Sequence, residues 1–309
     1  MIKILELFGG VGAPRKALIN LGIPHKSIDY VEIDEKAVRT YNALFEKHLE
    51  FQPQTVVGWN LKPDILVHGS PCQDFSIAGY QKGADEGSET RSSLMWETIK
   101  IIQNMGLWKP HIVIWENVKN VLSKHMRKNF NRYLIEMEKL GYTNSFETLN
   151  AMDFGIPQKR ERVFTVSLLG SNKFDFSKLE KLPLKNISEF LEAETDDKYI
   201  ITQPSMLKKI GDGEGSFQGR LKIIKDYTYT ITTKQLRCPN SGIIDLHNGK
   251  YRLLTEKECW RLMGFTDEDF NAALKVTPTR NNCLNNVLYR QAGNSIVVPV
   301  LEAIFKEVI

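Results

Sequence analysis

Asp64-Ile65-Leu66-Val67-His68-Gly69-Ser70-Pro71-Cys72 is the stretch that decides the fold of this 309-residue sequence. Residues 64–68 predict a short buried strand, and Gly69 and Pro71 predict an irregular turn directly after it. We therefore expect Cys72 to project from the carboxyl edge of a sheet, where α/β enzymes place reactive groups. A single cysteine is more often a small buried side chain than a nucleophile, so the rest of the chain must decide its role.

Strands and helices alternate on both sides of this stretch. Strands are expected at residues 3–8, 27–33, 111–115, 142–149 and 162–169, and helices at residues 14–21, 35–45, 93–105 and 129–140. This order predicts an α/β fold with a doubly wound, mostly parallel sheet. After residue 170 the pattern becomes short and mixed, and helices return at residues 255–263 and 297–308. We expect a large domain from residues 1–169 and 288–309 and a smaller irregular domain from residues 170–287.

Composition limits the classes of protein that this chain can be. Its 42% hydrophobic content supports a core, and no apolar run is long enough for a membrane span. The four cysteines (72, 238, 259 and 283) form no CxxC pair, which favours free thiols in a reducing, cytoplasmic compartment and no metal site. The net charge is +4, but residues 198–237 hold eight basic and three acidic side chains, a local charge of +5. This segment is either a solvated surface or a patch that faces phosphates.

A glycine turn and an acid indicate a cofactor. Residues 3–8 run into Gly9-Gly10-Val11-Gly12 before a helix, so the backbone is open to a ligand and the helix N-terminus favours negative charge. Glu32 comes at the end of the second strand, where a carboxylate can bind the hydroxyls of a ribose. The pattern predicts an adenosine-containing cofactor, and it leaves open whether this is NAD or S-adenosyl-L-methionine.

Six segments resemble those of the DNA (cytosine-5)-methyltransferases of bacterial and phage restriction-modification systems. They are a Phe-Gly-Gly loop at residues 7–12, Ser-Pro-Cys-Gln at 70–76, Glu-Asn-Val at 116–118, Gln-x-Arg-x-Arg at 158–162, a long motif at 252–265, and Gln-Ala-Gly-Asn-Ser within 289–295. They follow the family's order over nearly the whole chain. The resemblance implies a Rossmann-like methyltransferase domain and a smaller target-recognition domain, with residues 252–265 as the hinge between them.

The resemblance implies S-adenosyl-L-methionine as the cofactor. Ala13 stands where the family usually has another glycine, and Asn60 stands near the place of an aspartate that contacts the adenine. The residues expected to bind the cofactor are Phe8, Gly10, Val11, Gly12, Glu32, Ile33, Asn60, Pro71, Leu94, Asn294 and Ser295.

The expected reaction is methyl transfer to carbon 5 of cytosine through a covalent bond between Cys72 and carbon 6. A thiolate suits this attack, and Glu116 is the candidate to protonate or hydrogen-bond N3 as negative charge develops there. Arg160 and Arg162 alternate along a strand-like segment and are expected to share one face, with Arg162 at O2 of the base. No residue is an obvious base for the carbon-5 proton.

Double-stranded DNA is the expected partner, and the target base must leave the helix to react. The residues expected to bind DNA are Gln73, Ser76, Gln81, Lys82, Arg220, Thr232, Thr233, Lys234 and Arg237. The resemblance also implies a monomer, which acts without binding any cognate restriction endonuclease. Two alternatives stay open at this point: the same chemistry on tRNA, although the Cys-Phe-Thr segment of that branch is missing, and a DNA-binding homologue without activity.

Overall fold

A six-stranded sheet with one reversed strand forms the centre of the molecule. The computed structural model describes residues 1–45, 51–53, 55–56, 62–69, 94–210, 221–237, 239–280 and 283–309. The sheet order is β2-β1-β3-β4-β7-β5, and only β7 (Glu161–Leu169) runs antiparallel to its neighbours. The other strands are β1 (Ile2–Leu7), β2 (His25–Val31), β3 (Ile65–His68), β4 (Ile112–Val118) and β5 (Tyr142–Asn150). The prediction of a doubly wound, mostly parallel sheet is confirmed.

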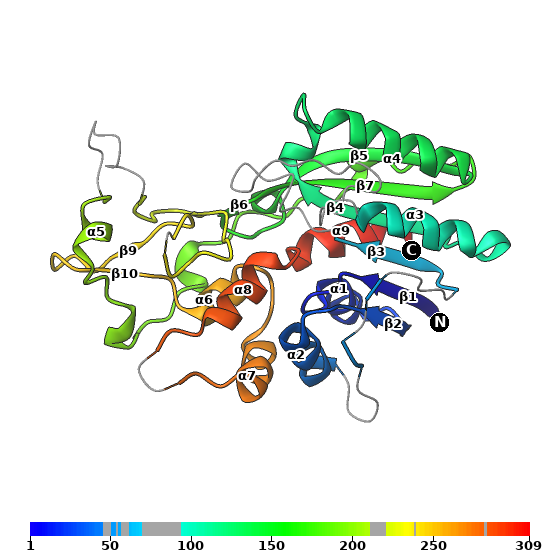
Figure 1. Ribbon diagram of the computed structural model, residues 1–309. Helices are drawn as coiled ribbons and strands as arrows, with labels where there is room; N and C mark the ends of the chain where they lie inside the picture. The colour runs from blue at the N-terminus through cyan, green and yellow to red at the C-terminus, as the bar shows by residue number, and fades with distance from the viewer. Residues whose placement is uncertain are drawn as a thin grey trace.

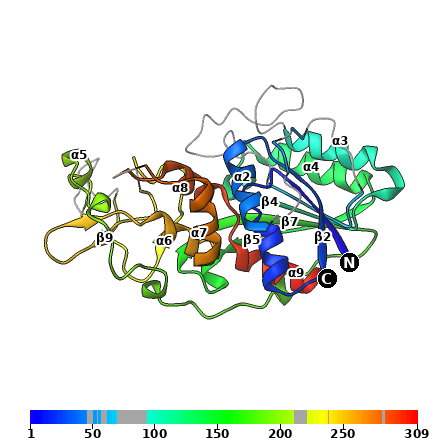
Figure 2. The same ribbon diagram turned by 90° about the horizontal axis from the view of Figure 1, so that it is seen from below.

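Helices cover both faces of this sheet, as Figures 1 and 2 show. The helices are α1 (Ala13–Asn20), α2 (Glu35–Phe45), α3 (Met95–Asn104), α4 (Arg127–Lys139) and α9 (Val298–Val308). Because side chains alternate along a strand, Ile4 and Ile114 join the core cluster that holds α1 and α9, whereas Leu5 and Val113 join the cluster that holds α3 and α4. The strands are thus buried on both faces, which explains their continuous apolar runs.

The smaller lobe contains short elements, and the helices α6 to α8 lie between it and the sheet (Figure 1). The lobe holds α5 (Pro204–Leu207), β9 (Ile244–Asp245) and β10 (Tyr251–Arg252), while β6 (Gln158–Lys159) pairs with β8 (Thr228–Tyr229). The connecting helices are α6 (Glu256–Arg261), α7 (Asp267–Val276) and α8 (Asn286–Asn294). Single 3-10 turns complete the fold at residues 106–108, 119–122, 151–153, 176–178, 187–189 and 197–199. The domain boundaries expected from the sequence stay a prediction.

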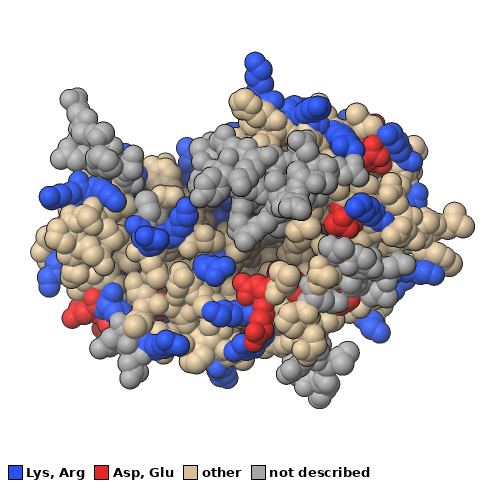
Figure 3. Space-filling model, in the orientation of Figure 1, with Lys and Arg blue, Asp and Glu red and all other residues tan. Residues whose placement is uncertain are grey.

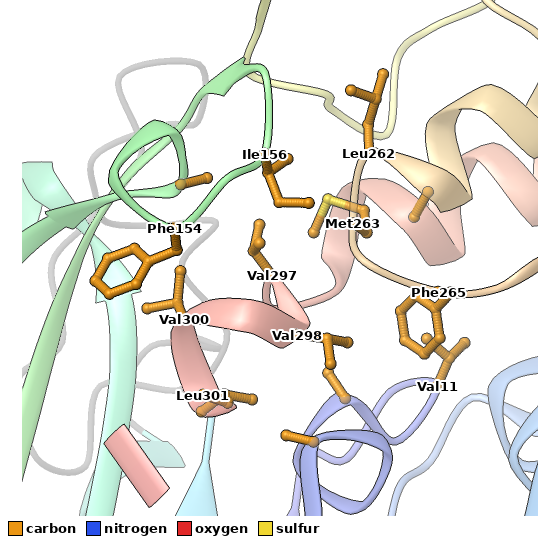
Figure 4. Close-up of a cluster of buried hydrophobic side chains, with 14 of the residues drawn as sticks. Val11, Phe154, Ile156, Leu262, Met263, Phe265, Val297, Val298, Val300 and Leu301 are labelled. Carbon is orange, nitrogen blue, oxygen red and sulfur yellow. The ribbon is translucent and has the colours of Figure 1, made fainter. Parts of the chain in front are cut away.

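The start of α9 joins the lobes because it inserts among side chains from distant parts of the chain. Figure 4 shows Val297 and Val298 between Ile156 and Met263 on one side and Val11 of the glycine loop on the other. These side chains are each at most 4% exposed. The carboxyl end of the chain therefore packs directly behind the loop that was expected to hold the cofactor.

Candidate active site

The carboxyl ends of β1 to β4 bring the predicted site residues to one edge of the sheet. The strand order reverses between β1 and β3, and ligands of open α/β sheets bind in the crevice at such a point. The glycine loop follows β1, Glu32 follows β2, Gly69 follows β3, and Glu116 lies near the end of β4.

The glycine loop turns sharply before α1. Gly10 and Gly12 have φ angles of 56° and 79°, a region that glycine adopts without a steric penalty. A Cβ atom on Gly12 would lie 2.5 Å from Phe45 and 2.6 Å from Tyr41, whereas one on Gly10 would meet nothing within 4 Å. Gly12 is therefore needed for packing, and Gly10 leaves open space beside the loop.

Glu32 links the second strand to the loop. Its carboxylate accepts hydrogen bonds from the backbone N–H of Gly10 at 3.0 Å, of Ile33 at 2.8 Å and of Asp34 at 3.0 Å. Tyr30 donates a 2.5 Å hydrogen bond to the carbonyl oxygen of Gly10 from the same strand. The acid is thus held at the crevice, next to the open face of the loop.

The other predicted cofactor residues surround this edge in different environments. Ile33 is 75% exposed, which is unusual for a large apolar side chain, and Val11 is buried. Phe8 is half-buried with a φ of 55°, Leu94 directly precedes α3, Asn294 is exposed, and Ser295 is buried. Asn60 and Pro71 lie outside the described residues.

Glu116 and Arg162 form an ion pair on neighbouring strands. Arg162 Nε lies 3.2 Å from Glu116 Oε1, and the side chains of Arg162 and Glu116 are 17% and 14% exposed, respectively. A Cβ atom on Gly69 would lie 4.0 Å from Glu116 Oε2, so the end of β3 reaches the same point. Cys72 follows Gly69 by three residues and lies outside the described part of the chain.

Burial raises the pKa of the Glu116 carboxyl above its usual value, and the positive charges of Arg162 and Arg160 oppose this shift. The neutral acid is therefore more available near neutral pH than it is for an exposed glutamate. A neutral carboxyl can donate a proton or a hydrogen bond, which is what the role expected of this residue requires.

Arg160 has a different environment from Arg162. The strand expected through both arginines is interrupted at Arg160, between β6 and β7, and the expectation that the two side chains share one face stays a prediction. Arg160 is 4% exposed and donates hydrogen bonds to the carbonyl oxygens of Ile231, Gly293 and Ser295. These contacts hold three backbone segments together. The catalytic role expected of Arg160 stays a prediction.

A cleft of ≈ 590 Å³ opens beside the ion pair. Figure 3 shows Lys and Arg side chains along the side of the smaller lobe. The cleft is lined by Val118, Lys119, Asn120, Lys159, Glu161, Arg162, Tyr229, Thr230, Thr232 and Asn240. The cleft thus joins the acid–arginine pair to residues of the segment that was expected to contact DNA.

The predicted DNA-binding residues fall into two groups. Thr232 lines the cleft, Thr233 is half-buried beside it, and Lys234 and Arg237 are exposed. Gln73, Ser76, Gln81, Lys82 and Arg220 lie outside the described residues. Sequence reasoning did not single out Lys119 or Lys159 for the cleft, although the basic pair Lys159–Arg160 within the Gln-x-Arg-x-Arg motif was a usable signal.

Neither a metal cluster nor a membrane-spanning helix is found among the described residues. No cluster of three or more His, Cys, Asp or Glu side chains in the described ranges is arranged to hold a metal ion. Among the helices that the structure describes, none has the length and apolar character needed to cross a membrane.

Comparison with known proteins identifies the family. The family model described as C-5 cytosine-specific DNA methylase matches residues 2–309. The chain belongs to this family. It is 33% identical to type II methyltransferase M2.ScrFI of Lactococcus lactis subsp. cremoris, with 99% of each protein covered. It is 32% identical to type II methyltransferase M.DsaV of Dactylococcopsis salina, over 100% of this chain and 86% of that protein.

Solved structures share the fold of this methyltransferase. The Dnmt2 methyltransferase of S. pombe superposes with a TM-score of 0.76 at 20% identity, covering 99% of this chain and 97% of that one. The methyltransferase EhMeth of Entamoeba histolytica gives a TM-score of 0.78 at 19% identity, with the same coverage. At these identities the likeness shows the fold alone. The family assignment depends on the sequence matches, and they make this chain an enzyme of the C-5 cytosine-specific DNA methylase family.

Proposed function

We propose that this enzyme transfers a methyl group from S-adenosyl-L-methionine to carbon 5 of a cytosine extruded from a short, specific duplex DNA sequence. The observation that carries the proposal is the partly buried Glu116–Arg162 pair, which lies at the carboxyl edge of the sheet beside a cleft. Glu116 also lies next to the end of β3, which leads into the Ser-Pro-Cys segment.

Cys72 is the proposed nucleophile. Carbon 5 of cytosine is a poor nucleophile, and addition of a thiolate to carbon 6 makes carbon 5 reactive as part of an enamine. Once carbon 5 has gained the methyl group, loss of its proton and elimination of the thiolate restore the ring. No described residue is assigned to remove that proton, and water is the proposed acceptor.

Glu116 and Arg162 are the proposed partners of the pyrimidine ring. Attack at carbon 6 moves negative charge to N3 and O2, so a neutral carboxyl at N3 and a guanidinium at O2 stabilise the transition state. Burial raises the pKa of Glu116, which favours the neutral acid, and the 3.2 Å contact with Arg162 fixes the direction of the carboxyl group.

The loop at residues 9–12 and the carboxylate of Glu32 suit S-adenosyl-L-methionine. The space beside Gly10 would admit the ligand, and Glu32 lies where ribose hydroxyls would bind. Exposed Ile33 offers an apolar surface for an adenine ring. The cofactor supplies an electrophilic methyl group, while the residues of this chain hold it at the crevice that Glu116 borders.

Duplex DNA is the proposed substrate because the cleft combines lysines with residues that can hydrogen-bond bases. Lys119 and Lys159 provide positive charge for phosphates, and Tyr229, Thr230 and Thr232 lie on the side of the lobe. Extrusion of the target base costs a few kcal/mol, which contacts in this cleft must offset. A monomer that acts without binding an endonuclease belongs to the same proposal.

Expression of the chain in a host without cytosine-5 methylation, followed by bisulfite sequencing of the host DNA, tests this proposal. We expect one short methylated sequence with the wild-type chain and none with Cys72→Ser. Purified enzyme with tritiated cofactor should label duplex DNA and leave tRNA unlabelled. Label in tRNA alone would support the tRNA alternative, and no label in either would favour a binding protein without activity.

A further inference from the structure

Arg160 joins three segments that are far apart in the sequence. Its Nη1 donates a 2.9 Å hydrogen bond to the carbonyl oxygen of Ile231. Its Nη2 donates to the carbonyl oxygens of Gly293 at 3.1 Å and Ser295 at 2.8 Å. One guanidinium therefore connects the strand region before β7, the segment that contains Thr232 and Thr233, and the segment that contains Asn294 and Ser295.

The last two of these segments also touch directly. A Cβ atom on Gly293 would lie 2.5 Å from the backbone carbon of Thr232 and 2.6 Å from the backbone nitrogen of Thr233. Backbone atoms cannot move aside as a flexible side chain can, so only glycine permits this approach. The end of α8 is therefore in van der Waals contact with the main chain of residues 232–233.

Gln158 holds the N–H of the residue whose carbonyl oxygen Arg160 holds, Ile231. Its Oε1 accepts a 3.0 Å hydrogen bond from the N–H of Ile231, and its Nε2 donates to the carbonyl oxygen of Leu262 at 2.8 Å. The side chain is fully buried. Residue 231 is thus fixed at both its N–H and its carbonyl oxygen, and a displacement there must be transmitted to its neighbours.

We propose that Arg160 is a positioning residue that couples DNA recognition at residues 231–233 to cofactor binding at residues 293–295. This inference rests on the proposed function, because it takes the first segment to contact DNA and the second to contact S-adenosyl-L-methionine. When one ligand orders its segment, the entropy that the other ligand must remove to order the second segment becomes smaller. Each ligand then lowers the Kd of the other by the same factor.

The experiment measures this factor in the full-length enzyme. The Kd of S-adenosyl-L-homocysteine is determined by calorimetry with and without the duplex identified by bisulfite sequencing, and the Kd of the duplex is determined with and without that ligand. We expect a coupling factor in the wild-type enzyme of about 5–150, the usual range for coupled sites. Arg160→Lys should bring this factor close to about one, since a lysine presents its donors from a single nitrogen and lacks the planar fork whose Nη1 and Nη2 hold these oxygens.

Arg252→Lys is the matched control. Arg252 is also 4% exposed, but its guanidinium hydrogen-bonds to Glu258 and to the carbonyl oxygen of Leu253, and to none of residues 231, 293 and 295. A general loss of stability should therefore appear in both variants, and a loss of coupling only in Arg160→Lys. If the coupling factor of Arg160→Lys equals that of the wild-type enzyme, the inference is wrong.

Gly293→Ala keeps the test decisive if Arg160→Lys does not fold. The added methyl group must push the backbone of Thr232 and Thr233 away while the arginine stays in place. We expect weaker DNA binding and a reduced coupling factor. An unchanged coupling factor in this variant also contradicts the inference. Failure of the proposed function itself is distinguishable, because it appears as a wild-type enzyme that methylates no DNA.

Discussion

Alanine substitutions at Gly10 and Gly12 separate the ligand-binding role of the glycine loop from its packing role. Both residues have a positive φ, so a side chain at either costs about 1–2 kcal/mol. Their surroundings differ: a Cβ atom on Gly10 meets open space, whereas one on Gly12 would lie 2.5 Å from Phe45 and 2.6 Å from Tyr41. The two variants should therefore lose different properties.

The expected magnitudes follow from these distances. Gly12→Ala adds overpacking of about 1–3 kcal/mol to the backbone strain, for a total loss in the free energy of unfolding of about 2–5 kcal/mol. Gly10→Ala should lose only about 1–2 kcal/mol, but its methyl group enters the space proposed for the cofactor. We expect its Kd for S-adenosyl-L-homocysteine to rise about tenfold or more, equivalent to about 1.4 kcal/mol.

Urea denaturation followed by circular dichroism measures the first quantity, and calorimetry measures the second. Gly106→Ala is the control, because Gly106 has the same φ of 56° and the same open surroundings but precedes β4 at the opposite edge of the sheet. It should match Gly10→Ala in stability and the wild-type enzyme in ligand affinity. Equal stability of Gly10→Ala and Gly12→Ala would refute the packing argument, and wild-type affinity in Gly10→Ala would refute the ligand site.

Three further predictions concern ion pairs and the acid. Glu116→Gln should lower kcat about 10²–10⁴-fold while DNA binding persists. The pKa of Glu116 is higher in the folded than in the unfolded chain, so the unfolding free energy of the wild-type enzyme relative to this variant should fall as pH rises above about 4.5, by about 1.4 kcal/mol for each pH unit between the two pKa values. A pH-independent difference would contradict a raised pKa. Arg162→Ala removes the nearer opposing charge, so the pKa of Glu116 should rise further and the alkaline limb of the pH–rate profile should move to higher pH; a movement to lower pH would be inconsistent with the pair. Lys16→Met breaks the 2.7 Å ion pair with Asp269 that joins α1 to α7, and urea denaturation should show a loss of about 2–4 kcal/mol, since both side chains are nearly buried; a loss below about 1 kcal/mol would indicate a solvated pair.

The sheet and its helices could be predicted because local patterns determine them. Residues 35–45 carry an amphipathic repeat and form α2 with the same bounds, and the apolar runs of the parallel strands reflect burial on both faces. Among the described residues three helices were missed: the four-residue α5, α7 and α8. α7 had a readable signal in the capping box of Thr266 and Asp269, whereas the end of α8 coincides with a motif that indicates no secondary structure by itself.

The contacts of Arg160 with the backbone of residues 231, 293 and 295 could not be predicted from the sequence. The spacing of Arg160 and Arg162 indicates a strand, but β6 consists of two residues and is formed by pairing with residues 228–229, some 70 positions away. A contact of this kind has no local pattern to reveal it. The close approach of Gly293 to Thr232 is likewise a property of the assembled fold, since nothing beside that glycine in the sequence indicates its neighbour.

Trapping with DNA that contains 5-fluorocytosine tests the central claim most directly. Fluorine at carbon 5 cannot leave as a proton does, so the thiolate stays bonded to carbon 6 after methyl transfer. Incubation of the enzyme with S-adenosyl-L-methionine and the fluorinated target duplex, followed by peptide mass spectrometry, should find the nucleotide attached at Cys72 and no adduct in Cys72→Ser. Methylated product that accumulates on ordinary target DNA while Cys72 shows no adduct would contradict the account.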